Sequence, residues 1–152
     1  MNPRSRKRPA EGVCPSIHRP TIALVTVCTG HREPWLADPE VHELLTRIWT
    51  TSVAWRVGRY VLLPDHLHLF ARPGEPEVPI ERWVRYWKNR FRALSPCRNR
   101  RFQDGCWHHR LRHFESYLDR WEYVRHNPVR HGLVLRPDLW PFQGELFDLG
   151  WD

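Results

Sequence analysis

The sequence predicts an α+β sandwich in which a mainly antiparallel sheet is flanked by helices. Short β-branched or apolar runs alternate with amphipathic helical segments, and two of these runs meet at Pro64-Asp65 as a hairpin would. Strands joined both by a hairpin and by helical crossovers are typical of this class. The sequence contains no internal repeat.

The first two elements are a strand and a helix. Residues 21–29 (TIALVTVCT) are rich in β-branched side chains, which predicts a buried strand. Residues 39–52 place apolar side chains at helical spacing. Asp38 precedes them as a favoured N-cap, and Pro39 occupies the first helical position.

The middle of the chain predicts a hairpin followed by a second helix. Residues 55–63 and 66–71 have the composition of strands, and Pro64-Asp65 separates them. A loop at 73–79 containing Pro and Gly then leads to a second amphipathic helix. Its apolar stripe consists of Ile80, Trp83, Val84, Trp87, Phe91 and Leu94.

The last third predicts a basic loop at 95–100, a strand at 106–112 and a helix at 114–127 that Pro128 ends. The inner stripe of this helix is expected to contain Phe114, Tyr117, Leu118, Trp121 and Arg125. The segment 129–152 has apolar anchors but no clear periodicity. The order strand, helix, two strands, helix, strand, helix predicts a ferredoxin-like sandwich.

The length of 152 residues fits one domain, which we expect to span 21–152. A hydrophobic content of 41% with nine Trp makes a packed core feasible. Residues 1–20 hold four Pro and several Arg, with too few apolar groups to offset the entropy of ordering, so we expect a flexible basic tail.

The charge balance favours a polyanionic partner. Lys and Arg number 24 against 17 acidic residues, a net charge of +7, and cations that neutralise phosphates release condensed counterions. A basic protein without such a partner is the alternative. The candidates for contacts to a DNA backbone cluster around the second helix and the loop after it, where a solvated helix face is the alternative: Arg82, Arg85, Lys88, Arg92, Arg98, Arg100 and Arg101.

Cysteine spacing and hydropathy point to the cytoplasm. The four Cys are scattered without C-x-x-C spacing and predict reduced thiols. No apolar run reaches the roughly 18 residues of a membrane span, so we expect no membrane association. The basic, polar N-terminus lacks the hydrophobic region of a secretory signal.

Two motifs could carry chemistry. In His66-Leu67-His68-Leu69 the imidazoles lie two apart on a strand and share one face, where they could converge on a metal ion. An ordinary pair of strand histidines is the alternative. Tyr123 lies off the apolar stripe of its helix with Asn127 one turn later, which suits a nucleophile beside a polar ligand, or simply a surface aromatic.

The motifs together resemble a known family. YVLLPDHLHLFARPGE, then RFQDGCWHHRLR, then SYLDRWEYVRHNPVRHGLV and WPF are similar to the REP-associated tyrosine transposases. These are relatives of the IS200-type single-tyrosine transposases within the HUH endonuclease superfamily. The resemblance runs from about residue 21 to 143, and its most specific elements are LPDHLH and Y-V-x-x-N-P-V-x-x-G-L-V in that order.

The resemblance implies a metal-dependent single-stranded DNA endonuclease and strand transferase that acts on hairpin, palindromic-repeat DNA. His66 and His68 match the family's metal ligands, Asn127 its third ligand, and Tyr123 the nucleophile that forms a 5′-phosphotyrosine. The implied metal is Mg²⁺ or Mn²⁺. We expect a cytoplasmic, nucleoid-associated monomer or homodimer.

Two positions depart from the family pattern. Phe102-Gln103 stands where relatives commonly have Trp-Gln, and His108-His109 where they tend to have an acidic residue and His, which puts a charge-balancing role for position 108 in doubt. Two other functions compete. A histidine-triad nucleotide hydrolase would need a third His where Phe70 stands. A catalytically silent, domesticated DNA-binding or regulatory protein would keep the fold without the chemistry.

Overall fold

A computed structural model describes residues 21–112 and 114–150, so the predicted basic tail 1–20 lies outside the described residues. The five strands are β1 (Ala23–Cys28), β2 (Trp55–Leu62), β3 (His66–Pro73), β4 (Trp107–Arg110) and β5 (Gln143–Glu145). The helices are α1 (Pro39–Thr50), α2 (Ile80–Leu94), α3 (Tyr117–Arg125) and α4 (Asn127–Arg130), with short 3₁₀ turns at Gly30–Arg32 and Pro137–Leu139.

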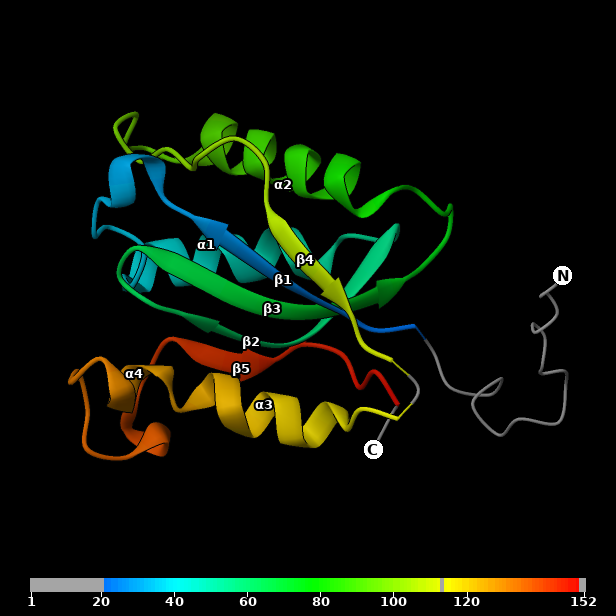
Figure 1. Cartoon of the computed structure of the whole chain (residues 1–152). Coiled ribbons are helices and arrows are strands. Elements are labelled where there is room, and N and C mark those ends of the chain that lie inside the picture. The colour runs from blue at the N-terminus through cyan, green and yellow to red at the C-terminus, as the bar shows by residue number, and fades with distance from the viewer. Residues whose placement is uncertain (1–20, 113, 151–152) are drawn as a thin grey trace, which may run out of the picture.

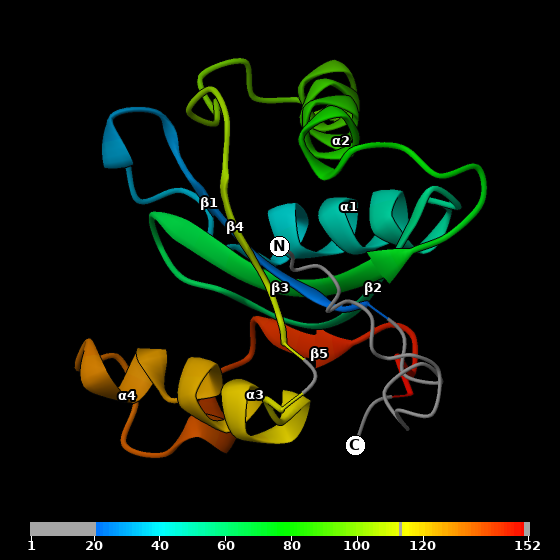
Figure 2. The ribbon, with the colours of Figure 1, turned by 45° about the vertical axis from the view of Figure 1, so that its right-hand side comes forward.

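The strands form one sheet in the order β4-β1-β3-β2-β5, and every neighbouring pair is antiparallel. Helices α1 and α2 cover one side of the sheet, and α3 and α4 lie on the other (Figures 1 and 2). The predicted α+β, ferredoxin-like sandwich with a mainly antiparallel sheet is confirmed.

Local signals account for the start of α1. The Asp38 carboxylate accepts hydrogen bonds from the backbone N–H groups of Glu40 (3.0 Å) and Val41 (3.2 Å), which satisfies donors that a helix start leaves without partners. Pro39 takes the first helical position, as predicted. This cap fixes the residue at which α1 begins.

The predicted helix 114–127 is wrong in its bounds, and its predicted inner stripe is right at Tyr117 and Trp121 and wrong at Phe114, Leu118 and Arg125. Helix α3 begins at Tyr117, with Ser116 as its N-cap, and ends at Arg125; a separate short helix, α4, then holds Pro128 in its first turn. Proline lacks only an N–H that the first turn does not use, so it starts α4 instead of ending a longer helix. Tyr117, Trp121 and Val124 are buried against the sheet, while Phe114 and Leu118 are exposed.

Strand β5 was not predicted from the sequence. It consists of Gln143–Glu145 and pairs antiparallel with β2 through Arg59, Tyr60 and Val61. Three residues with a central Gly show neither alternation nor β-branched side chains, so no local pattern marks them.

The two sides of the sheet have different cores. Between the sheet and α1 and α2 lies a large apolar core that includes Trp49, Trp55, Trp83 and Trp87. Between the sheet and α3 lies a smaller cluster around Phe70, Tyr117 and Trp121.

Within the described residues, no helix is long and apolar enough to cross a membrane.

Candidate active site

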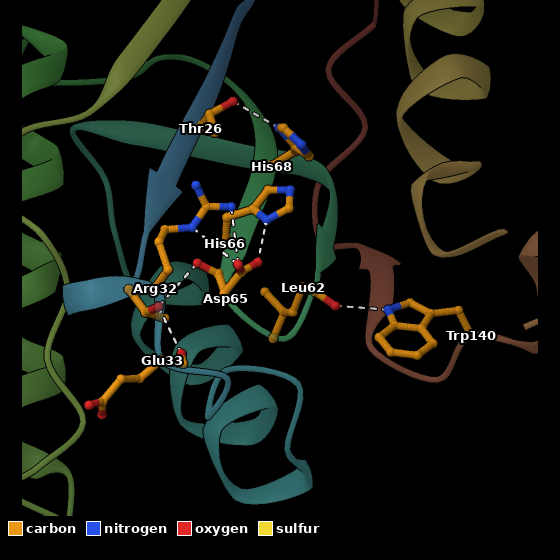
Figure 3. Close-up of polar contacts among 9 residues, drawn as sticks. Thr26, Arg32, Glu33, Leu62, Asp65, His66, His68 and Trp140 are labelled. Atoms are coloured by element: carbon orange, nitrogen blue, oxygen red, sulfur yellow. Dashed lines mark hydrogen bonds and ion pairs between the residues drawn. The ribbon is translucent and has the colours of Figure 1, made fainter. Parts of the chain in front are cut away.

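The two histidines of β3 lie side by side on the α3 side of the sheet. Their ring centroids are 5.0 Å apart and the rings are nearly perpendicular. Leu67 and Leu69, which alternate with them, are fully buried in the opposite core. The shared face of His66 and His68 that the sequence predicted is therefore confirmed (Figure 3); the metal that it suggests stays a prediction.

A neighbouring carboxylate orients His66. Asp65 Oδ1 lies 2.8 Å from His66 Nδ1, and the Arg32 guanidinium lies 3.1 Å from Asp65 Oδ2 (Figure 3). Burial raises the pKa of Asp65, but its hydrogen bond to His66 and the charge of Arg32 outweigh this and bring it below its usual range. Because an ionised carboxylate only accepts hydrogen bonds, His66 donates from Nδ1 to Asp65, and Nε2 is the ring nitrogen left for another partner.

His68 has a different partner on the adjacent strand. Its Nδ1 lies 2.8 Å from Thr26 Oγ1, across the β1–β3 ladder. Burial, with smaller effects from the positive charges of His66, Arg130 and His131, lowers the pKa of His68 to about 3. The imidazole is therefore neutral at physiological pH, the form in which histidine binds metals.

The α3–α4 junction brings Tyr123 and Asn127 to one guanidinium. Tyr123 points away from the buried stripe and is 64% exposed. Arg130 Cζ lies 4.1 Å from the centroid of the Tyr123 ring. Arg130 Nη2 also donates hydrogen bonds of 2.8 Å to the Tyr123 carbonyl and to Asn127 Oδ1. Arg130 thereby links the predicted nucleophile to the predicted third ligand.

His131 connects this junction to the histidine pair and was not singled out from the sequence. Its ring centroid lies 5.8 Å from that of His66, and its charge contributes to the lowered pKa of His68. His131 follows α4 directly, so the end of that helix lies beside the start of β3. The only sequence signal was its place within HNPVRHGLV, whose periodicity does not show which sheet face it meets.

His66 and His68 would need a further ligand to hold a divalent metal ion, and that ligand is not a His, Cys, Asp or Glu of the described residues. Among the residues that the structure describes, no group of three or more His, Cys, Asp or Glu could hold a metal ion. Two imidazoles therefore need an oxygen ligand of another kind, and the amide oxygen of Asn127 is one. It accepts a hydrogen bond from Arg130 and has a second lone pair to offer.

The predicted DNA-binding cations divide into two groups. Lys88 donates hydrogen bonds to the carbonyls of Gln103 and Gly105, and Arg100 forms ion pairs with Asp38 (3.7 Å) and Glu40 (3.9 Å), so both hold the loop before β4 in place. The other five are exposed: Arg82, Arg85, Arg92, Arg98 and Arg101. A groove of about 520 Å³ runs between α2 and residues 100–106 and includes members of both groups.

The position where a histidine triad would have its third His belongs to the core. Phe70 is fully buried and packs on Tyr117 and Trp121, with ring centroids 5.0 and 6.3 Å away. Nothing at this position can contact a nucleotide, which leaves the histidine-triad hydrolase without support.

The fold places the protein among the α+β sandwiches in which helices cover both faces of an antiparallel sheet (Figure 1). A solved REP-associated tyrosine transposase bound to a REP hairpin superposes with a TM-score of 0.67, at 23% identity, over 88% of this chain and 86% of that one. At that identity the match shows the shared fold.

Sequence comparison then finds two relatives that carry the same family name. A REP-associated tyrosine transposase of Escherichia coli (strain K12) is 30% identical over 89 residues, or 58% of this chain and 53% of that protein. A second relative, from Haemophilus influenzae, is 28% identical over 94 residues, or 53% of each chain. No family model matches. The chain spans about half the length of these curated relatives, and the similarity to REP-associated tyrosine transposases that its motifs predicted is confirmed.

Proposed function

We propose that the protein is a metal-dependent single-stranded DNA endonuclease and strand transferase that acts on hairpin DNA through Tyr123. One observation carries the proposal: an oriented imidazole pair and an exposed tyrosine lie on the same side of the sheet, joined through Arg130 and His131. The names of the relatives support it, since they are tyrosine transposases and one of them binds a REP hairpin.

The residues suit phosphodiester cleavage. A phosphodiester is an anion that repels nucleophiles, so cleavage needs a cation at a non-bridging oxygen and a positioned attacker. His66, His68 and Asn127 would hold Mg²⁺ or Mn²⁺, which supplies that Lewis acid when bound. Arg130 places a second positive charge at the Tyr123 ring, where the DNA backbone must approach.

The covalent step uses Tyr123 as the nucleophile. Its phenol oxygen forms a bond to phosphorus and loses its proton, while the bond from phosphorus to the 3′-oxygen breaks and that oxygen takes up a proton. The products are a 5′-phosphotyrosine and a free 3′-hydroxyl. Attack of a 3′-hydroxyl on that phosphotyrosine reverses the step, which transfers a strand without ATP.

The other three tyrosines are less suited to the attack. Burial raises the pKa of Tyr60 and of Tyr117 to about 12, and the Tyr117 hydroxyl accepts a hydrogen bond from the Arg59 N–H. Tyr86 is exposed but lies on α2, across the sheet from the histidine pair. Tyr123 combines exposure with a place on the side of the sheet where His66 and His68 lie.

Trapping the covalent adduct tests the proposal. The protein is incubated with Mg²⁺ or Mn²⁺ and a DNA hairpin carrying single-stranded flanks, and the adduct is mapped by mass spectrometry. We expect it on Tyr123, and we expect Tyr123→Phe to keep DNA binding and lose the adduct. His66→Ala and His68→Ala should also lose it. An adduct on another tyrosine, or full cleavage in EDTA, would contradict the proposal.

The same experiment distinguishes a catalytically silent, domesticated DNA-binding protein. That alternative predicts tight hairpin binding with no adduct under any metal condition. The presence of His66, His68 and Tyr123 together argues against it, because lost catalysis gives no reason to keep them.

A further inference from the structure

Trp107 has the most exposed indole among the tryptophans of residues 21–112 and 114–150. It is 58% exposed, whereas the remaining tryptophans of the described residues are buried or half-buried. A single exposed aromatic is common on protein surfaces and means little by itself. Its position in the sheet and the side chains around it distinguish Trp107 from an ordinary exposed aromatic.

Trp107 lies in the same row of the sheet as the candidate site. It pairs with Thr26 on β1, and Thr26 pairs with His68 on β3, so the three side chains share one face. Two strand spacings separate the backbones of Trp107 and His68, about 10 Å. A neighbouring nucleotide of a strand whose phosphate lies at the histidines could reach that far.

The ring of His109, two residues along the same strand, lies beside the indole. The two rings are nearly parallel, at 16° and 6.2 Å between centroids. His109 Nε2 lies 3.2 Å from Glu115 Oε1, and the same carboxylate accepts hydrogen bonds from the Arg112 N–H (2.6 Å) and from Arg120 (2.8 Å). Glu115 thereby orients the ring that lies beside Trp107.

The charge around Trp107 suits a nucleic acid better than an apolar protein surface. The segment from Trp107 to Arg112 reads WHHRLR, with two Arg, two His and no acidic residue, in a chain of net charge +7. An exposed aromatic in a basic segment is a combination with which proteins bind single strands, because every base has a face to stack.

We propose that Trp107 is a stacking platform for an unpaired base next to the phosphate that the histidine face receives. The inference rests on the proposed function and adds to it the position that holds the single strand. The His109–Glu115–Arg120 cluster lies beside the platform.

The test measures binding separately from cleavage, in the Tyr123→Phe background. The probe is a DNA hairpin with a single-stranded flank, in which each flank position in turn carries 2-aminopurine or an abasic site. Trp107→Ala should weaken binding about tenfold, within the range that stacking on one base supplies. Trp107→Phe should keep most of the affinity. Tyr86→Ala is the matched control, since Tyr86 is 54% exposed on the other side of the sheet.

The flank substitutions identify the stacked base. At one position, 2-aminopurine should be quenched by the protein with Trp107 and not by Trp107→Ala. An abasic site at that position should cost the Trp107 protein about the same tenfold and cost Trp107→Ala nothing further.

Three results would overturn the inference. Trp107→Ala and Tyr86→Ala could bind equally well, the loss could be the same at every abasic position, or Trp107→Ala could change the sedimentation of the free protein, which would make this face a self-association surface. Wild-type adduct formation alongside any of these leaves the proposed function intact. Abasic coupling without any adduct in the wild type leaves only the platform. Absence of DNA binding would overturn both.

Discussion

The two sides of the sheet carry different kinds of side chain. On the α1–α2 side, Trp87 packs edge to face against Trp49 and Trp83, with ring centroids 5.4 and 6.2 Å away. The α3–α4 side has a smaller apolar cluster, and beside it lie imidazoles, carboxylates and guanidinium groups in hydrogen-bonded chains. One side therefore supplies most of the hydrophobic stabilisation, and the other carries the polar groups.

This division shows how a small domain can carry an exposed polar site. Polar side chains held at a partly open surface add little to stability, so another part of the fold must supply it. Here a single strand, β3, serves both needs, since its alternate residues are buried leucines and the histidine pair. The comparison predicts that mutations on the two sides will separate stability from activity.

The largest separation is expected between Trp87→Ala and Tyr123→Phe. Trp87 is fully buried, so its truncation should cost about 3–5 kcal/mol of unfolding free energy. Tyr123 is 64% exposed, and loss of its hydroxyl should change that free energy by less than about 0.5 kcal/mol. Urea unfolding of both variants measures this. Comparable losses would mean that stability is not concentrated on the α1–α2 side.

A smaller, pH-dependent effect is expected from Glu115→Gln. The Arg112 N–H, and then Arg120 and His109, lower the pKa of Glu115 to about 2, from an ordinary value of 4.5. The stability that this carboxylate contributes is therefore complete above about pH 4.5 and is lost as the pH falls toward 2. Glu115→Gln should cost about 1–2 kcal/mol at pH 7, and less at pH 3.

The control for Glu115 is Glu122→Gln, which removes an exposed ion pair with Arg125 on α3 (3.0 Å). Such pairs contribute about 0.5 kcal/mol or less. Urea unfolding at the two pH values compares the variants. A Glu115→Gln deficit that does not shrink with falling pH would show that packing, and not charge, explains it.

The smallest effect compares two tryptophans within the α1–α2 core. Trp83 Nε1 donates a hydrogen bond of 2.7 Å to Ser52 Oγ, whereas Trp87 Nε1 is buried without a hydrogen-bond partner in the part of the chain that the structure describes. Trp83→Phe should therefore be more destabilising than Trp87→Phe, by about 1 kcal/mol. Thermal unfolding of the matched pair measures the difference, and the reverse order would contradict it.

The sequence predicts the fold best where local signals agree. In α1, periodicity, Asp38 and Pro39 all point to the same start, and the structure has it. In the last third the signals conflict, because Pro128 reads as a helix stop although a new helix can begin with it. β5 is set by its pairing with β2, a long-range contact that leaves no mark on three residues.

The residues of the candidate site also differ in how far the sequence predicts their roles. Strand alternation is enough to place His66 and His68 on one face. The family motif draws attention to Tyr123 and Asn127, but only the structure brings both of them to Arg130. The roles of Lys88 and Arg100 in holding the loop before β4 were not predictable, because charge alone does not distinguish a surface cation from one that binds carbonyls or carboxylates within the fold.

The strand pairing that joins Trp107, Thr26 and His68 fixes the distance between the proposed base-binding position and the histidine pair. Their separation is set by the hydrogen-bonded pairing of β1 with β3 on one side and with β4 on the other. If Trp107 holds a base, the fixed distance to the histidine pair sets the number of nucleotides between that base and the cleaved phosphate. Inserting one nucleotide between the hairpin and its single-stranded flank should then move the cleavage position together with the stacked base, whichever base occupies the junction.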